Sequence, residues 1–157
     1  MNWFIFPQAI VTFFISMNFH TSMTFESEVS TYIYGGQSSE VSITLANNKK
    51  TLIIKANKKP IDTTMSVFVK GIEYAFRVKY TDTINNQWHL HIFPAKINSI
   101  YKLITKNEDY SLMEGTNSLL LINNKKIPLI VNDEQVKTRT YLSKGAPVFI
   151  NEKRIYN

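Results

Sequence analysis

The chain alternates apolar and polar residues over many short stretches, and the alternation is most regular between Asp62 and Tyr80. A period of two places the apolar side chains on one face of a β-strand. Lys70-Gly71 interrupts the pattern, and glycine reaches backbone angles that a tight turn requires. We therefore predict a β-hairpin with one buried face. Its apolar positions are Met65, Val67 and Val69 in the first strand, and Tyr74, Phe76, Val78 and Tyr80 in the second.

Other segments of the first 95 residues have the same strand character and end at turn-forming residues. The expected strands are 28–34, 41–45, 51–56 and 87–93, separated by Gly35-Gly36, Asn47-Asn48, residues 57–60 and a polar turn at 82–86. Within 87–93, Trp88 shares a face with Leu90 and Ile92, so we expect it to join the aromatic core. Short strands at this spacing predict an all-β fold, an immunoglobulin-like β-sandwich spanning residues 25–95.

Pro94-Ala95-Lys96 marks an expected domain boundary, and the rest of the chain reads as a small β-rich C-terminal extension. Residues 100–105 fit a strand or a short helix, and 107–115 read as a polar turn. Two hairpins are expected, one over 119–131 and one over 148–156. We expect residues 96–157 either to pack on the first domain or to fold within an assembly.

The N-terminal segment is apolar and carries no charged side chain before Glu26. The run from Trp3 to Phe19 has the length of a signal-peptide core, and Ser22-Met23-Thr24 offers a small-x-small site before Phe25. These features predict a signal peptide at residues 1–24 and a periplasmic or outer-membrane associated protein. The segment lacks Lys and Arg and is interrupted by Pro7, however, so the alternative of a buried N-terminal strand or helix stays open.

Residues 52–78 contain a motif that is also found in a known family. The family's pattern is a Leu-x-[Ile/Val] strand, then Thr-Asn-[Leu/Met]-x-Val, a short turn and Tyr-x-Phe-x-[Val/Leu]. The matching residues here are Leu52, Ile54, Thr63, Thr64, Met65, Val67, Tyr74, Phe76 and Val78. The chain thus resembles the periplasmic β-domain of type IV secretion outer-membrane core subunits, including TraN-type proteins of conjugative transposons. Thr64 replaces the usual Asn, and Val69 stands where Thr is common.

The resemblance implies a structural, protein-binding component of a conjugation or type IV secretion envelope complex. Its expected partners are other subunits of the transfer apparatus and further copies of itself. Exposed strand edges such as Thr51–Ala56 would accept a neighbouring strand. A different class, an exported β-sandwich that serves in adhesion or carbohydrate binding, is the alternative, and exposed aromatic residues away from the core would favour it.

The net charge of +6 and the absence of cysteine narrow the possible functions. The lysines are spread along strands and turns, which indicates a solvated basic surface rather than a nucleic-acid site. The densest group is Lys49, Lys50, Lys55, Lys58 and Lys59. Without cysteine the chain forms no disulfide and has no thiolate chemistry or cysteine-based zinc site.

Two histidines are the weak candidates for a metal site. His89 and His91 are two residues apart in an expected strand, so both project from one face. A metal site needs a third ligand, and nothing in the sequence positions Glu73 or Asp82 there. Solvent-facing residues explain the pair more simply. We find no nucleophile elbow or phosphate-binding glycine loop. We therefore predict no catalytic residue, no cofactor and no enzymatic activity, with a metal-dependent enzyme at the two histidines as the weakest alternative.

Overall fold

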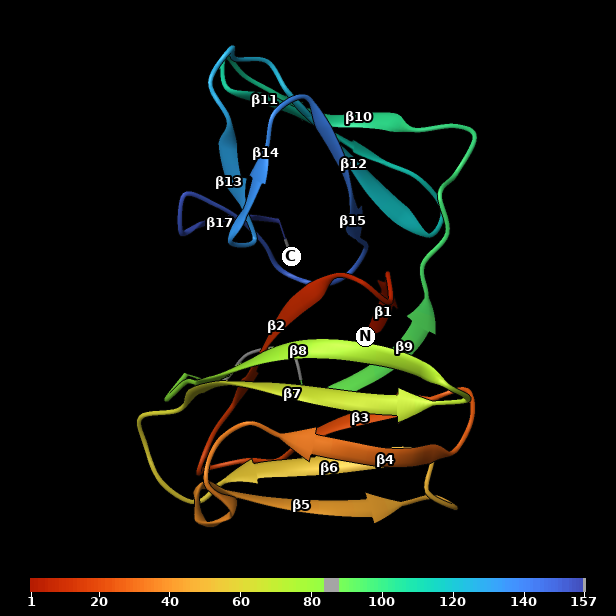
Figure 1. Ribbon diagram of the computed structural model, residues 1–157, viewed down its shortest axis with the longest axis vertical. Coiled ribbons are helices and arrows are strands. Elements are labelled where there is room, and N and C mark those ends of the chain that lie inside the picture. The colour runs from red at the N-terminus through yellow and green to blue at the C-terminus, as the bar shows by residue number, and fades with distance from the viewer. Residues whose placement is uncertain (84–87, 157) are drawn as a thin grey trace.

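The computed structural model describes residues 1–83 and 88–156 and is an all-β protein of two lobes stacked along the long axis (Figure 1). Its one helical turn in the described residues is a 3-10 segment at Ser38–Glu40. The lower lobe in Figure 1 is a β-sandwich and the upper lobe holds the C-terminal strands. No helix of the described chain has the length and apolar character to cross a membrane.

Two sheets form the sandwich. The five-stranded sheet has the order β1 (Asn2–Ile5), β9 (His89–Pro94), β3 (Thr21–Phe25), β6 (Thr51–Ala56) and β5 (Val41–Ala46). The four-stranded sheet has the order β2 (Ile10–Ile15), β8 (Ile72–Tyr80), β7 (Asp62–Val69) and β4 (Val29–Tyr34). Three pairs are parallel, namely β1 with β9, β3 with β9, and β2 with β8. The sandwich predicted from alternation is therefore present, built on mixed sheets.

The predicted hairpin is confirmed as β7 and β8. The two strands pair in continuous antiparallel register from Asp62 with Lys79 to Val69 with Ile72. Lys70 and Gly71 both have positive φ, 50° and 75°, as a two-residue turn of the primed type requires. The predicted inner face is buried, apart from a partly exposed Tyr80.

The N-terminal segment lies inside the sandwich, which corrects the predicted boundary at residue 25. Trp3 and Ile5 of β1, and Phe13 and Ile15 of β2, have no exposed surface. The ring of Phe13 meets that of Phe76 edge to face, with centroids 5.5 Å apart. The alternation within this apolar run indicated strands. Of the two interpretations of residues 1–24, a buried N-terminal strand is the one that agrees with the structure. Cleavage before Phe25 would remove β1, β2 and most of β3.

The C-terminal lobe contains two four-stranded sheets. The first has the order β10 (Lys102–Lys106), β11 (Tyr110–Glu114), β12 (Ser118–Asn123) and β15 (Arg139–Ser143). The second has the order β14 (Glu134–Val136), β13 (Leu129–Val131), β16 (Val148–Ile150) and β17 (Lys153–Tyr156). The lobe has its own buried cluster: Leu112, Leu119, Leu121, Leu129, Val131, Val136, Leu142, Val148 and Ile150. It is thus more than the expected small extension.

Three predictions for this lobe have different outcomes. The hairpin at 148–156 is confirmed as β16 and β17. The polar turn expected at 107–115 is wrong, because β11 occupies most of it. The hairpin expected over 119–131 is also wrong, because β12 pairs with β11 and β15 whereas β13 pairs with β14 and β16. The apolar pattern located both strands but carried no information about their partners.

A short segment after β15 attaches this lobe to the sandwich. The backbones of Phe4 and Lys144 form an isolated antiparallel bridge. Ala146 is buried within the core cluster of the sandwich. Gly145 between them has a φ of 88°, and a Cβ there would overlap the carbonyl oxygen of Asn2. The tight approach of these backbones therefore requires glycine at position 145.

Candidate functional site

The predicted histidine pair lies on the outer face of the five-stranded sheet. His89 and His91 are both exposed and project from the same side of β9, as their spacing predicts. The nearest polar partner is Ser22 of β3, whose Oγ is 2.7 Å from His89 Nδ1. The His20 ring lies 6.1 Å from that of His89. The described residues nevertheless contain no group of three or more metal-ligating side chains that could hold an ion.

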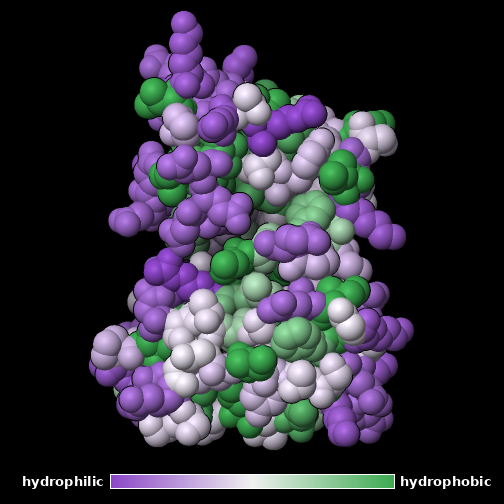
Figure 2. All heavy atoms as spheres, viewed as in Figure 1, coloured by the Kyte–Doolittle hydropathy of each residue, from purple (hydrophilic) through white to green (hydrophobic). Residues whose placement is uncertain are grey.

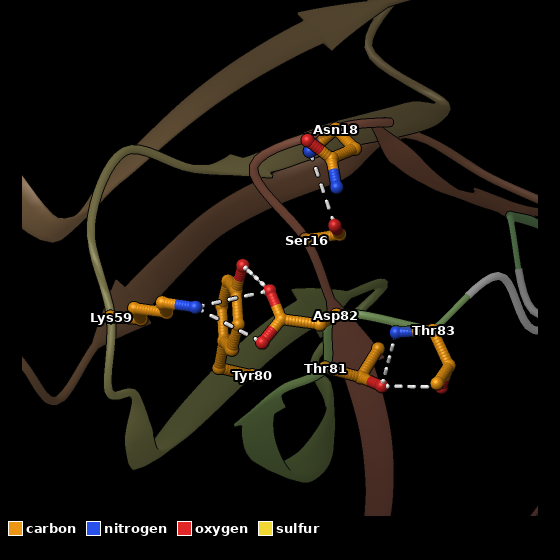
Figure 3. Close-up of polar contacts among 7 residues, drawn as sticks. All are labelled: Ser16, Asn18, Lys59, Tyr80, Thr81, Asp82 and Thr83. Atoms are coloured by element: carbon orange, nitrogen blue, oxygen red, sulfur yellow. Dashed lines mark hydrogen bonds and ion pairs between the residues drawn. The ribbon is translucent and has the colours of Figure 1, made fainter.

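The two acidic residues considered as further ligands lie elsewhere. Glu73 accepts a hydrogen bond from Ser66 Oγ at 2.6 Å on the other sheet. Asp82 accepts one from the Tyr80 hydroxyl at 2.6 Å and forms an ion pair with Lys59 at 3.0 Å (Figure 3). The hydrogen bond from Tyr80, followed by that from Lys59, lowers the pKa of Asp82. The polar turn expected at 82–86 falls mostly outside the described residues.

Trp88 is not a core residue, contrary to the prediction. It is 41% exposed and packs on Phe19 with ring centroids 5.7 Å apart. The strand begins only at His89, so the inward direction that Leu90 and Ile92 share does not extend to Trp88. Its carbonyl oxygen accepts hydrogen bonds from the backbone N and Oγ of Ser22. Exposed Trp88 and partly buried Phe19 thus lie near the histidines.

The strand edge expected at Thr51–Ala56 is also wrong. This strand, β6, pairs with β3 on one side and β5 on the other, so its backbone is occupied on both sides. Strand order follows from contacts distant in sequence, which the local pattern of residues does not encode. The edge strands of the sandwich are β1, β5, β2 and β4.

The most exposed apolar strand is β10, at an edge of the C-terminal lobe (Figure 1). All five of its residues are exposed, including Leu103 at 58% and Ile104. Ile97 and Ile100, in the segment that leads into it, are exposed as well. The lobe is otherwise largely hydrophilic on the side shown in Figure 2, with isolated hydrophobic groups. We call Ile97, Ile100, Lys102, Leu103, Ile104 and Lys106 the β10 surface.

A groove separates the two lobes on the side of β8. Arg77 of β8 holds both carboxylate oxygens of Asp62, at 2.8 and 3.0 Å, and reaches Asp133 of the other lobe at 2.6 Å. The groove holds about 410 Å³. Asp133 is thus an inter-lobe ion-pair partner. The hydrogen bonds from Arg77 lower the pKa of Asp62. The Arg77 guanidinium is already paired with Asp62 and Asp133. We therefore assign the groove a structural role.

Comparisons with known proteins give no further guide: no family model matches the chain, and no curated protein matches it.

Proposed function

We propose that this protein is a structural, protein-binding component of a cell-envelope complex of the conjugation or type IV secretion kind. The observation that supports this proposal is the β10 surface, where an edge strand exposes large aliphatic side chains. Single exposed apolar residues are normal on a protein surface, whereas four large aliphatic side chains are exposed here within residues 97–104. In this proposal the protein contributes binding surfaces and no catalysis.

The β10 surface suits the addition of a strand from another subunit. β10 pairs with β11 on one side, with a bulge at Ile104, and its other side pairs with no strand of the described residues. Each backbone hydrogen bond contributes about 1 kcal/mol. Full burial of one large aliphatic side chain contributes about 1.5–3 kcal/mol. A short added strand that covers Leu103 and Ile104 would thus provide specific binding.

The charges of β10 favour a different subunit over a second copy. If two β10 strands paired antiparallel about the bulged residue Ile104, Lys102 of one copy would lie close to Lys106 of the other. Like charges directly opposite each other destabilise a strand pair. An incoming strand that carries Asp or Glu at those positions avoids the repulsion. We therefore assign the β10 surface to another apparatus subunit, and leave homo-oligomer formation to other edges of the molecule.

The motif that resembles type IV secretion core subunits supports the envelope setting. Its residues lie in β6, β7 and β8, in the middle of the sandwich. The proposed location is the periplasm or the outer membrane, and this part of the proposal depends on the motif. Residues 1–24 lend it no support, because they form core strands.

Site-specific photo-crosslinking in the native cell tests the proposal. A photoreactive amino acid at Leu103 should crosslink to another apparatus subunit, identified by mass spectrometry. The control is the same amino acid at Ile33, which is 60% exposed on edge strand β4. Crosslinks of equal yield and identity at both positions, or none at Leu103, would refute the proposal.

Exposed Trp88 favours a second candidate, a carbohydrate-binding module. Aromatic side chains with one exposed face suit stacking on sugar rings, and Trp88 and Phe19 lie beside polar Ser22 and His89. A glycan array with the wild-type protein and Trp88→Ala tests this function. Saturable glycan binding that Trp88→Ala removes, with no crosslink at Leu103, would favour this candidate over the first.

A further inference from the structure

Tyr74 is the one tyrosine of the described chain that is fully buried, at 4% exposure. No hydrogen-bond partner for its hydroxyl is found among the described residues. Four other tyrosine hydroxyls have partners: Tyr34 with Glu40, Tyr80 with Asp82, Tyr101 with Ser118, and Tyr156 with Glu114. Buried polar groups in native proteins are nearly always hydrogen-bonded, and an exception calls for an explanation such as a bound ligand or water.

The Tyr74 side chain borders a cavity of about 100 Å³. The cavity opens at the end of the sandwich where β3 and β7 end and β8 begins, the end toward which the β7 arrow points in Figure 1. Its apolar lining residues are Phe25, Val69, Ile72, Ile92 and Pro94. The ring of Phe25 lies 5.7 Å from that of Tyr74. The cavity is therefore lined by apolar side chains on one part and by Glu26, Ser27 and Lys70 on another, with the Tyr74 ring in its wall.

The cavity, at about 100 Å³, is smaller than the enclosed apolar cavity of about 150 Å³ that binds benzene. A space of about 100 Å³ admits a narrow aliphatic chain or about three water molecules, since a water occupies about 30 Å³. The apolar part of the wall favours an aliphatic ligand over water molecules, because an aliphatic ligand removes apolar surface from contact with water.

The charge near the hydroxyl indicates which end group such a chain would carry. Burial raises the pKa of Tyr74, and the negative charge of Glu26 raises it further, so the phenol stays neutral. Glu26 lies exposed in the lining of the cavity. Lys70 also lines the cavity, but Glu26 is the charged group that acts on the Tyr74 hydroxyl. A cation is thus favoured beside Glu26, and an anion is disfavoured there.

We propose that this cavity, the Tyr74 cavity, binds a primary ammonium group on a short unbranched aliphatic chain. The chain packs against Val69, Ile72 and Ile92, and the ammonium donates hydrogen bonds to the Tyr74 hydroxyl oxygen and to the Glu26 carboxylate. Two sources share this chemistry: a free alkylamine, and a lysine side chain of another protein. The site lies in the sandwich, away from the β10 surface. This proposal is therefore tested independently of the function proposed above.

An NMR titration of the full chain with n-butylamine tests the site, with n-butanol as the neutral probe of similar shape. We expect saturable methyl shifts at Val69, Ile72 and Ile92 with n-butylamine, and at least tenfold weaker binding of n-butanol. Glu26→Gln changes an exposed residue and should weaken n-butylamine binding about two- to fivefold. Tyr74→Phe keeps the ring and should weaken it about tenfold.

The peptide acetyl-Gly-Lys-Gly-amide separates the two sources. Competition with n-butylamine would support the site and assign it to a lysine side chain, whereas n-butylamine binding without competition would support a free amine. The proposal is overturned if n-butylamine causes no saturable shift. It is also overturned if n-butanol binds as tightly as n-butylamine and Glu26→Gln binds n-butylamine as tightly as the wild type. The hydroxyl would then be hydrated and the cavity would hold only water.

Discussion

Phe4 and Lys144 exchange both backbone hydrogen bonds, with N–O distances of 2.8 and 3.0 Å, and so join the first strand of the chain to the C-terminal lobe. Phe4 is also paired with Phe93 in the parallel ladder of β1 and β9, and the two rings stack with centroids 5.4 Å apart. One strand therefore contacts both lobes. Any change that displaces β1 should affect the sandwich and its attachment to the second lobe together.

Trp3→Ala tests the role of the N-terminal segment. Trp3 has no exposed surface, and truncation of a fully buried large side chain costs about 3–5 kcal/mol of unfolding free energy. The control in the same segment is Ile10→Ala, because Ile10 is half-exposed and should change stability by about 0.5 kcal/mol or less. Urea denaturation monitored by fluorescence and circular dichroism measures both. Equal, small effects would mean that the first strands do not belong to the folded core.

Gly145→Ala tests the close backbone contact between the lobes. Alanine at a φ of 88° is strained, and its Cβ would also overlap the Asn2 carbonyl. Gly71→Ala is the matched control, because Gly71 has a φ of 75° but an added Cβ meets no described atom within 4 Å. We expect a loss of about 1–2 kcal/mol for Gly71→Ala from strain alone, and a larger loss for Gly145→Ala. Equal losses in denaturant unfolding would contradict the close approach.

The ion pair of Arg77 with Asp62 makes the stability depend on pH. Arg77 lowers the folded-state pKa of Asp62 below its unfolded value of 3.8. The stabilisation is therefore fully present above the unfolded pKa and is lost as the pH falls through the folded pKa. Asp62→Asn should accordingly be less stable than the wild type at pH 7, and the difference should shrink toward zero near pH 2. A difference that is the same at both pH values would show that the carboxylate charge plays no part.

Local sequence patterns predicted the parts of the fold that depend on neighbouring residues. Alternation and a positive-φ turn located β7 and β8, whose pairing partners are adjacent in sequence. The parallel pairing of β1 with β9 joins opposite ends of the sandwich sequence, and nothing in either strand specifies the other. The same limit explains β6, which was expected at an edge and lies between two strands.

The candidate sites were harder to predict for a related reason. His89 and His91 share an exposed face as their spacing indicates, but Trp88 turns outward because the strand starts one residue later. The signal for the β10 surface was present as the adjacent apolar pair Leu103 and Ile104, which breaks the alternation of a half-buried strand. Tyr74 was expected on the buried face, but that its hydroxyl has no partner among the described residues became apparent only from its surroundings.

The lysines of β10 should limit self-association through this edge. Replacing Lys102 and Lys106 with glutamine removes the repulsion between two antiparallel β10 strands while Leu103 and Ile104 stay exposed. We expect this variant to show concentration-dependent dimers in analytical ultracentrifugation that are absent from the wild type. Adding Leu103→Lys to it should restore the monomer, because a charge on an exposed edge strand opposes pairing. Unfolding free energies should stay within about 0.5 kcal/mol for all three proteins, since every changed residue is exposed. If the glutamine variant stays monomeric at high concentration, charge repulsion is not what keeps this edge free, and the assignment of an acidic partner strand loses its basis.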